Sequence, residues 1–375
     1  MDQQEIINTI ILTRINYFNL TGMLELYRRC GSATEVMAHK NDIRDIIPNA
    51  SPKLVEAFKN TDEARHRAET EYEWDNAHGI LPLCMNDHRY PQRLKECDDA
   101  PLMLFYKGTA DLNQTKVISI VGTRHCTTYG QDLIRRFMSE LRQICPQVLI
   151  VSGLAYGVDI CAHRHALQNG YETVGVLAHG LDYLYPPRHK YTADEMVNRG
   201  GLLTEFLTNT NADKVNFVRR NRIVAGIADA TILVESAAHG GGLITTKLAR
   251  DYNRDVFAFP GAVGATYSEG CNNAIRDQWA SLISNAHDFA KAMRWEGDML
   301  LHEAYEKGIE RQLFPNLTPE EKKVVDTLSR DNDLQINMLS VRSDIPISNL
   351  TALLFSLEMK GVVKTLPGGT YHLMK

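Results

Sequence analysis

The sequence predicts an α/β fold, with a doubly wound, mostly parallel sheet in the middle of the chain, a small helical domain before it and a winged helix after it. Three observations predict this arrangement. Through the middle of the chain, short and continuously apolar runs alternate with segments of helical periodicity. The first part shows helical periodicity alone, and the last part is patterned as helices followed by a hairpin. A length of 375 residues is enough for two or three such domains.

The overall composition is that of an ordinary globular protein, with 44% hydrophobic and 23% charged residues. A formal net charge of −5 argues against a basic surface over the whole molecule, so binding of nucleic acid would depend on local clusters of positive charge. Seven cysteines include no C-x-x-C pair and their number is odd, which favours a reduced, cytoplasmic protein. No run of residues is apolar for long enough to predict a signal peptide or a membrane span.

Residues 1–77 are expected to form the small helical domain, of the SAM or helix-hairpin-helix kind. Apolar residues recur there at helical spacing, and Gly22 and Gly31 punctuate short turns. Helical units with glycine turns can grip DNA backbones, but the pattern favours a packing or interaction module. The next stretch, 78–111, contains three prolines and is expected to be a linker that ends in a short strand.

Residues 112–290 are expected to form the central sheet domain. Its strands are continuously apolar and are separated by helical segments, which is typical of a parallel sheet covered by helices on both faces. Such a doubly wound arrangement is Rossmann-like. The six expected strands lie within 116–122, 148–153, 172–180, 200–206, 230–236 and 255–261.

The last part of the chain, 316–375, is expected to be a winged helix that follows a linker at 291–315. Thr318 is placed to cap a helix and Glu321 to complete a capping box, and a later helix is expected to end at Gly361 before a hairpin. A helix that reads the major groove should carry Arg, Lys, Asn or Gln. The later helix is mostly apolar, which favours packing or partner binding over the reading of duplex DNA.

In an open parallel sheet, ligands bind beyond the carboxyl ends of the strands, so the loops directly after the strands are the candidate site. Each of these loops offers either a cation or glycines that leave backbone N–H groups open to an anion. The block 216–229 adds three arginines just before the fifth strand. The residues concerned are Arg124, Ser152, Gly153, Arg188, His189, Lys190, Arg219, Arg220, Arg222, Gly240, Gly241 and Gly242. Together they predict a surface for an extended, phosphate-bearing ligand.

Several other sites lack support in the sequence. The first loop is not G-x-G-x-x-G and no acidic residue stands in the ribose position, which argues against NAD, and no P-loop motif occurs. Cys161, His163 and His165 invite a metal site, but no second ligand cluster accompanies them, so helix packing is the favoured interpretation. Asp159 and Glu235 could act as general bases, although a role in orienting the arginines is favoured.

The loops as an ordered series resemble the DNA processing protein A family, also called DprA or Smf. The motifs that carry the resemblance are "IVGTRHCTTYG", "VSGLAYGVDICAHRHAL", "GLDYLYPPRHKYTADEM", "FVRRNRIVAGIADATILVESAAHGGGLITTKLA", "DVFAFPG" and "EGCNNAIRD". The resemblance implies a cytoplasmic, usually dimeric protein that binds single-stranded DNA without sequence preference. It further implies protection of incoming strands during natural transformation, loading of the RecA recombinase, and no enzymatic activity or cofactor.

Matched motif by motif, the resemblance also implies a set of DNA-contacting residues. A cationic track and a ring for base stacking are what single-stranded DNA requires, and Phe217 is the one aromatic residue inside the arginine block. Lys214, just upstream, is expected to add a cation. The full set is Arg124, Gly153, Arg188, Lys214, Phe217, Arg220, Asn221, Arg222, Gly240, Gly241 and Gly242.

The chain also departs from the family pattern, and two other functions stay open. Tyr156 replaces a residue that is usually basic, Val218 a common proline and Gly241 a usual serine. One alternative is a phosphoribohydrolase-type enzyme acting on nucleoside monophosphates, although the glycine loop lacks that class's proline and its following glutamate. The other is a transcription regulator that binds duplex DNA through the winged helix.

Overall fold

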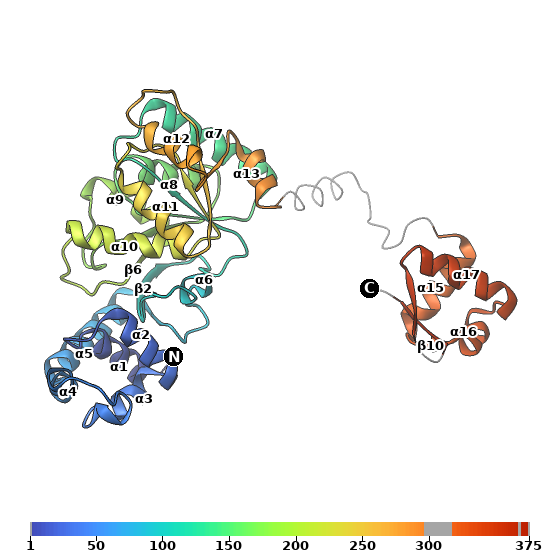
Figure 1. Ribbon diagram of the computed structural model, residues 1–375, viewed down its shortest axis with the longest axis horizontal. Helices are drawn as coiled ribbons and strands as arrows, with labels where there is room; N and C mark the ends of the chain where they lie inside the picture. Colours follow the sequence, from blue (N-terminus) through green and yellow to red (C-terminus); the bar gives the residue numbers. More distant parts are fainter. Residues whose placement is uncertain (1, 296–316, 367–368, 374–375) are drawn as a thin grey trace. The chain divides into compact units, whose positions relative to one another are not determined.

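The computed structural model describes residues 2–295, 317–366 and 369–373 (Figure 1). The chain divides into two compact units, residues 1–299 and 300–375. The first unit holds the helical domain and the large sheet, and the second holds the winged helix. Within the described ranges, no helix combines the length and the apolar character needed to cross a membrane. Most of the linker expected at 291–315 lies outside the described residues.

The first unit begins with the expected group of helices, whose apolar faces pack on one another. Asn19 accepts a hydrogen bond from the N–H of Gly22 and caps a helix there, and Gly31 ends that helix with a φ of 86°, a conformation that favours glycine. Ile10 and Phe58 are fully buried between the helices. The elements are α1 (Gln3–Thr13), α2 (Leu20–Cys30), α3 (Ala33–Ala38), η1 (Ile43–Asp45), α4 (Pro52–Lys59) and α5 (Asp62–His78).

The large sheet has nine strands in the order β1-β2-β6-β5-β4-β3-β7-β8-β9. Neighbouring strands from β6 to β9 in this order are parallel, whereas β1 and β2 are antiparallel to their neighbours. All six expected strands are present. The strands are β1 (Leu81–Cys84), β2 (Met103–Gly108), β3 (Val117–Val121), β4 (Leu149–Ser152), β5 (Thr173–Val176), β6 (Gly200–Thr204), β7 (Ala230–Leu233), β8 (Asp255–Ala258) and β9 (Ser281–Leu282).

The stretch 78–111, expected to be a linker that ends in a short strand, ends in β2 and also supplies β1 and the short helix α6 (Gln92–Lys95). β2 pairs with β6, and β1 pairs with β2 at the outer edge. Pro82 lies inside β1, where its missing N–H is tolerated because an edge strand has hydrogen-bonding partners on one side alone. Pro82 therefore marks an edge of the sheet.

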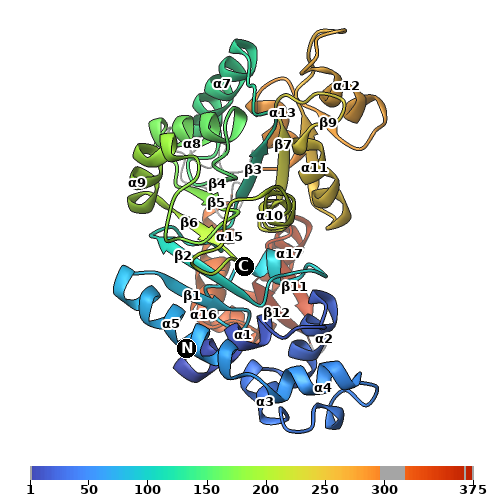
Figure 2. The same ribbon diagram turned by 90° about the vertical axis from the view of Figure 1, so that its left-hand side faces the viewer.

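Helices cover both faces of the sheet, as expected for a doubly wound fold (Figure 2). Ile118 and Ile150 face the helices that carry Phe137 and Phe289, whereas Val121 joins the other core with Val224. This alternation along each strand places α7, α8 and α13 on one face and α10 and α11 on the other. The helices are α7 (Thr128–Ile144), α8 (Val158–Gln168), η2 (Pro187–His189), α9 (Lys190–Asn198), α10 (Lys214–Gly226), α11 (Gly241–Asp251), α12 (Glu269–Arg276) and α13 (Ala286–Ala292).

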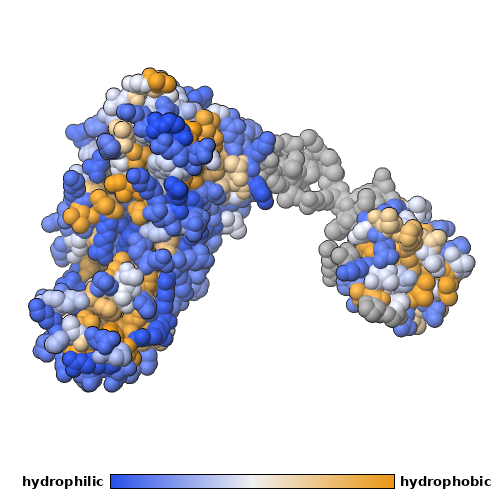
Figure 3. Space-filling view, viewed as in Figure 1, coloured by the Kyte–Doolittle hydropathy of each residue, from blue (hydrophilic) through white to orange (hydrophobic). Residues whose placement is uncertain are grey.

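The second unit is the expected winged helix. Thr318 and Glu321 form the capping box, and the buried Glu321 also binds Lys360 Nζ at 2.7 Å. The last helix exposes 66% of Phe355 and 76% of Met359, and Figure 3 shows hydrophobic residues among polar ones on this unit. The elements are α15 (Pro319–Arg330), β10 (Leu334–Gln335), α16 (Ile336–Ser343), α17 (Ile347–Met359), β11 (Val363–Leu366) and β12 (Thr370–Leu373).

Candidate nucleic-acid interface

A hollow of about 570 Å³ lies where the loops after β3, β4 and β7 meet the start of α10. We call it the main pocket. Nine of the eleven site residues predicted from the sequence line it, so the structure brings most of the predicted site together. They are Arg124, Gly153, Lys214, Phe217, Arg220, Asn221, Gly240, Gly241 and Gly242.

Arg124 is exposed, and its loop is held by a buried carboxylate. Glu235, which is 3% exposed at the end of β7, accepts hydrogen bonds from the backbone N–H of Thr127 at 2.8 Å and from Thr127 Oγ1 at 2.6 Å. Thr127 in turn caps α7. Glu235 therefore orients the loop of Arg124 through Thr127, and its side chain is committed to that structural role.

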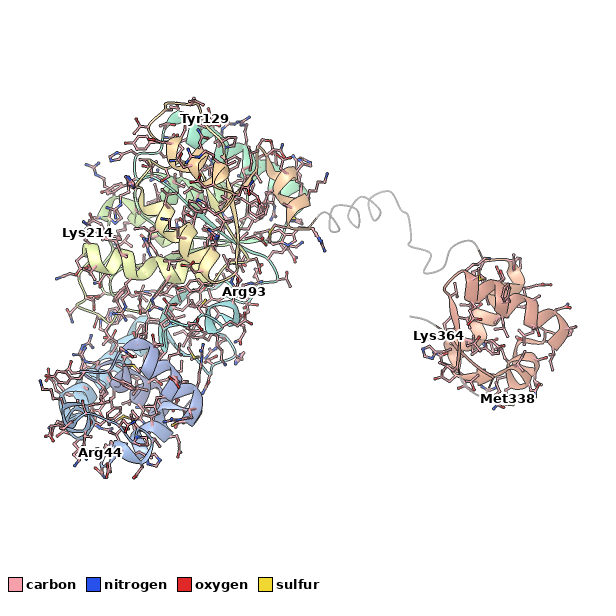
Figure 4. The ribbon with its side chains drawn as sticks, in the orientation of Figure 1. Arg44, Arg93, Tyr129, Lys214, Met338 and Lys364 are labelled. Carbon is pink, nitrogen blue, oxygen red and sulfur yellow. The ribbon has the colours of Figure 1, made fainter. Side chains whose placement is uncertain are left out.

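One side of α10 faces the main pocket. Asp213 caps the helix by accepting a hydrogen bond from the N–H of Asn216, and Lys214 follows at the exposed end of the helix (Figure 4). Lys214, Phe217, Arg220 and Asn221 recur at helical spacing and therefore lie on one face. This face gives the pocket two cations, one ring and one amide.

The half-buried ring of Phe217 lies between guanidinium groups and a second ring. The Cζ atoms of Arg124 and Arg220 lie 4.8 Å and 5.9 Å from its centroid, and the ring of Tyr185 lies 5.9 Å away. Cations over an aromatic face are attracted by its negative quadrupole. Phe217 therefore helps to position Arg124 at the rim while leaving part of its own surface open.

Arg220 forms the floor of the main pocket and is 4% exposed. Its Nη1 donates to the carbonyl oxygen of Gly153 at 2.6 Å and to that of Val176. Burial lowers the pKa of Arg220 to about 10, an effect that Asp159 opposes and Arg124 reinforces. The guanidinium therefore stays charged at neutral pH. A Cβ on Gly153 would lie 2.2 Å from Nη1, so the close approach of Arg220 requires glycine at this position.

Asp159 also lines the main pocket, close to Arg220, and is 9% exposed. Burial raises the pKa of its carboxyl group, against the opposing effects of Arg220 and of the N–H of Ala155, which lies 3.4 Å from Oδ2. The carboxyl group balances part of the charge of Arg220. The orienting role that the sequence favoured for Asp159 remains a prediction.

The glycine loop opens α11, and no side chain caps the first turn of that helix. Its backbone N–H groups and the positive end of the helix dipole thus face the main pocket. A Cβ on Gly242 would lie 2.9 Å from Gly122 Cα, so this contact between loops needs a glycine. A Cβ on Gly241 would meet no atom within 4 Å, so a side chain at 241 fits without strain.

Arg222 and Arg188 lie outside the main pocket, unlike the other nine residues predicted with them. Arg222 is 5% exposed and donates to Glu205 Oε2 and to the carbonyl oxygen of Asp99. Residues two positions apart on a helix point to different sides, so Arg220 and Arg222 cannot both face one pocket. Arg188 is exposed on η2 and lines neither the main pocket nor the two smaller hollows that share residues with it. We therefore leave Arg222 out of the interface.

Two tyrosines line this region that the predicted set left out. Tyr156 is 40% exposed and lines the main pocket, and Tyr185 is 40% exposed beside Phe217 in a small adjoining hollow. Both follow strands of the sheet, so the position of aromatic residues in strand-end loops was the signal that could have found them. With Phe217 they place three rings beside the cations.

The cysteine and histidines of α8 do not form a metal site in the structure. His163 is buried and its Nδ1 lies 2.7 Å from Thr173 Oγ1. Burial lowers the pKa of His163 to about 3, so the ring is neutral and packed against the sheet. Throughout the described residues, no group of three His, Cys, Asp or Glu side chains is arranged to hold a metal ion.

Two family models match the chain. The model of DNA recombination-mediator protein A matches residues 82–294, and that of the DprA winged helix domain matches residues 311–369. The DNA processing protein DprA of Streptococcus pneumoniae is 36% identical over 248 residues, which are 66% of this chain and 84% of that protein. Protein Smf of Escherichia coli is 30% identical over 305 residues, which are 80% of this chain and 78% of that protein.

Solved structures agree with these matches. The crystal structure of DprA from S. pneumoniae has a TM-score of 0.67 at 31% identity and covers 78% of this chain and 98% of its own. A structure of DNA processing protein A from Helicobacter pylori, which concerns the single-stranded DNA binding mode of that protein, has a TM-score of 0.52 at 26% identity. It covers 57% of this chain and 95% of its own. The chain therefore belongs to the DNA processing protein A (DprA/Smf) family.

Proposed function

We propose that this chain is a cytoplasmic protein that binds single-stranded DNA in the main pocket without preference for base sequence. The observation that carries the proposal is the convergence of Arg124, Lys214, Arg220, the start of α11 and the ring of Phe217 on one concave surface. Cations and open N–H groups suit phosphates, and a ring suits any base, because every base has a face that can stack.

The composition of the main pocket favours contacts to the DNA backbone over the reading of base edges. Its cations lie at the rim and on the floor, and the glycines let a backbone approach the N-terminus of α11 closely. Asn221 is a side chain of the predicted set that could contact a base edge, but a single amide cannot specify a sequence. We therefore expect similar affinity for strands of different composition.

Three further parts of the proposal follow from membership of the family. They are protection of incoming single strands, loading of RecA during natural transformation, and a homodimer formed through the Rossmann-like domain. A role in binding rather than catalysis is supported by the carboxylates of the site, since Glu235 holds Thr127 and Asp159 balances Arg220.

Fluorescence anisotropy of the full chain with single-stranded and duplex oligonucleotides of mixed sequence, over a salt series, tests the proposal. We expect salt-dependent binding with a clear preference for single strands. A preference for duplex DNA would instead favour a regulator acting through the winged helix. Absence of DNA binding at low salt, together with release of free base from AMP, would favour the phosphoribohydrolase alternative.

A further inference from the structure

A second hollow, of about 430 Å³, lies on the other side of Arg124, against α8. We call it the α8 pocket. Arg124 and Tyr156 line both this hollow and the main pocket, so the two share a rim. Its lining also includes His125, from the loop after β3, and Cys161, Arg164, His165 and Gln168, from α8. None of these α8 residues belongs to the set predicted from the sequence.

The polar lining of the α8 pocket is positively charged. Arg164 and Gln168 are four residues apart on α8 and both are exposed, so they lie on one face of the helix. The pocket is lined by two guanidinium groups and two imidazoles, and no Asp or Glu lines it. Within the described residues, no carboxylate lies within ion-pair distance of Arg164, whose Nε donates to Thr192 Oγ1 at 3.3 Å. Cations gathered in a concave surface without counter-charges attract an anion from solution.

We propose that the α8 pocket is a second phosphate-binding subsite, which holds nucleotides of the same single strand that occupies the main pocket. The proposal rests on the proposed function and extends the DNA-binding surface from the main pocket to the α8 pocket. The strand would pass Tyr156 between the two hollows. That ring is 40% exposed and is held on edge by His189, with 5.0 Å between the ring centroids. It therefore offers a stacking surface at the shared rim.

The shared rim favours a polymer over a small phosphorylated molecule. A mononucleotide would fill one hollow and leave the cations of the other without a counter-charge. A strand that continues across Arg124 and Tyr156 places successive phosphates near cations on both sides. The geometry thus predicts that affinity depends on strand length in a way that Arg164 controls.

A thiol inside the α8 pocket gives a direct reporter of occupancy. A hydrogen bond with Cys126, and another with His165, lower the pKa of Cys161 against the opposing effect of burial. The lowered pKa favours the thiolate, which is the form that reacts with alkylating reagents.

The first test compares Arg164→Ala with the matched control Arg250→Ala in the full chain. Arg250 is exposed on α11 and lines neither pocket. Anisotropy is measured with oligo(dT) of about four and about twelve nucleotides, lengths within the range that such sites accommodate. We expect Arg164→Ala to weaken binding of the longer strand several-fold and to reduce its slope of log K against log salt by about 0.7. Binding of the shorter strand should not change.

The second test measures alkylation of Cys161 by mass spectrometry, with Cys30 of the helical domain as the internal control. Both thiols are free and half-buried. The longer strand should protect Cys161 several-fold, whereas the shorter strand should leave both thiols unprotected. If the wild-type chain binds the longer strand but Cys161 stays reactive and Arg164→Ala behaves like Arg250→Ala, the α8 pocket is no subsite. If the wild-type chain binds neither strand, this proposal and the proposed function are both refuted.

Discussion

Replacement of Arg222 by alanine tests whether this arginine of α10 stabilises the fold or contacts DNA. Its guanidinium is buried and pairs with Oε2 of Glu205, whose other oxygen, Oε1, has no hydrogen-bond partner within the described residues. Removal of one partner of a buried ion pair costs about 3–5 kcal/mol of the free energy of unfolding. Arg219 Nη2 stays 3.0 Å from the same carboxylate, so we expect a cost near the lower end, about 3 kcal/mol.

A loss of this size is measurable by thermal denaturation. For a domain of this kind it lowers the melting temperature by about 6–12 °C. The salt slope of single-stranded DNA binding, measured on the folded variant, should stay at the wild-type value because Arg222 lies outside the main pocket. Arg222→Lys keeps the charge and should recover part of the stability. A normal melting temperature combined with a reduced salt slope would refute our placement of Arg222.

Four other substitutions test the site and its support. Arg124→Ala removes an exposed cation, so it should lower the salt slope by about 0.7 in anisotropy and leave the melting temperature unchanged; a lower melting temperature would contradict this. Gly153→Ala should displace the guanidinium of Arg220 and lower both stability and affinity, because the new Cβ would lie 2.2 Å from Nη1. Gly241→Ala should leave the melting temperature unchanged, because its Cβ would meet no atom within 4 Å. Burial lowers the pKa of His163 from an ordinary value of 6.5 to about 3 in the folded chain, so its contribution to stability is present above about pH 6.5 and lost as the pH falls toward 3. His163→Asn should flatten that part of a plot of stability against pH, and an unaltered plot would show that this ring does not control it.

The sequence predicted the six central strands because each is a continuous apolar run between helical segments, a pattern that a buried parallel strand requires. The sequence did not predict β1 and β9, because neither strand has a continuous apolar run of its own. β1 contains a proline and stands at an edge, and β9 has two residues, both exposed. Such strands take their structure from the neighbour they pair with, so their own residues carry little periodicity.

The structure brings predicted site residues together where a residue type and its loop position together determine its environment. Gly153 and Gly242 each lie where a side chain would meet another atom closer than 3.0 Å, and Arg124 is held at the rim through Glu235 and Thr127. Arginines on a helix are different, because their environment depends on helical phase and on what packs there. The sequence shows the spacing but not which side of α10 faces the pocket.

The position of Arg222 also explains why residues 78–111 are part of the sheet domain. Its bond to the carbonyl oxygen of Asp99 ties this segment to α10, and Tyr252 donates to Asp99 Oδ1 at 2.7 Å. Arg93 binds Asp229 at 2.6 Å, at the residue that leads into β7. These polar contacts anchor the segment to the sheet domain. The contact with α10 is made on the side of that helix that faces away from the main pocket. Loss of Arg222 should therefore loosen the edge strands first, and hydrogen exchange of β1 and β2 in Arg222→Ala should rise before that of β3.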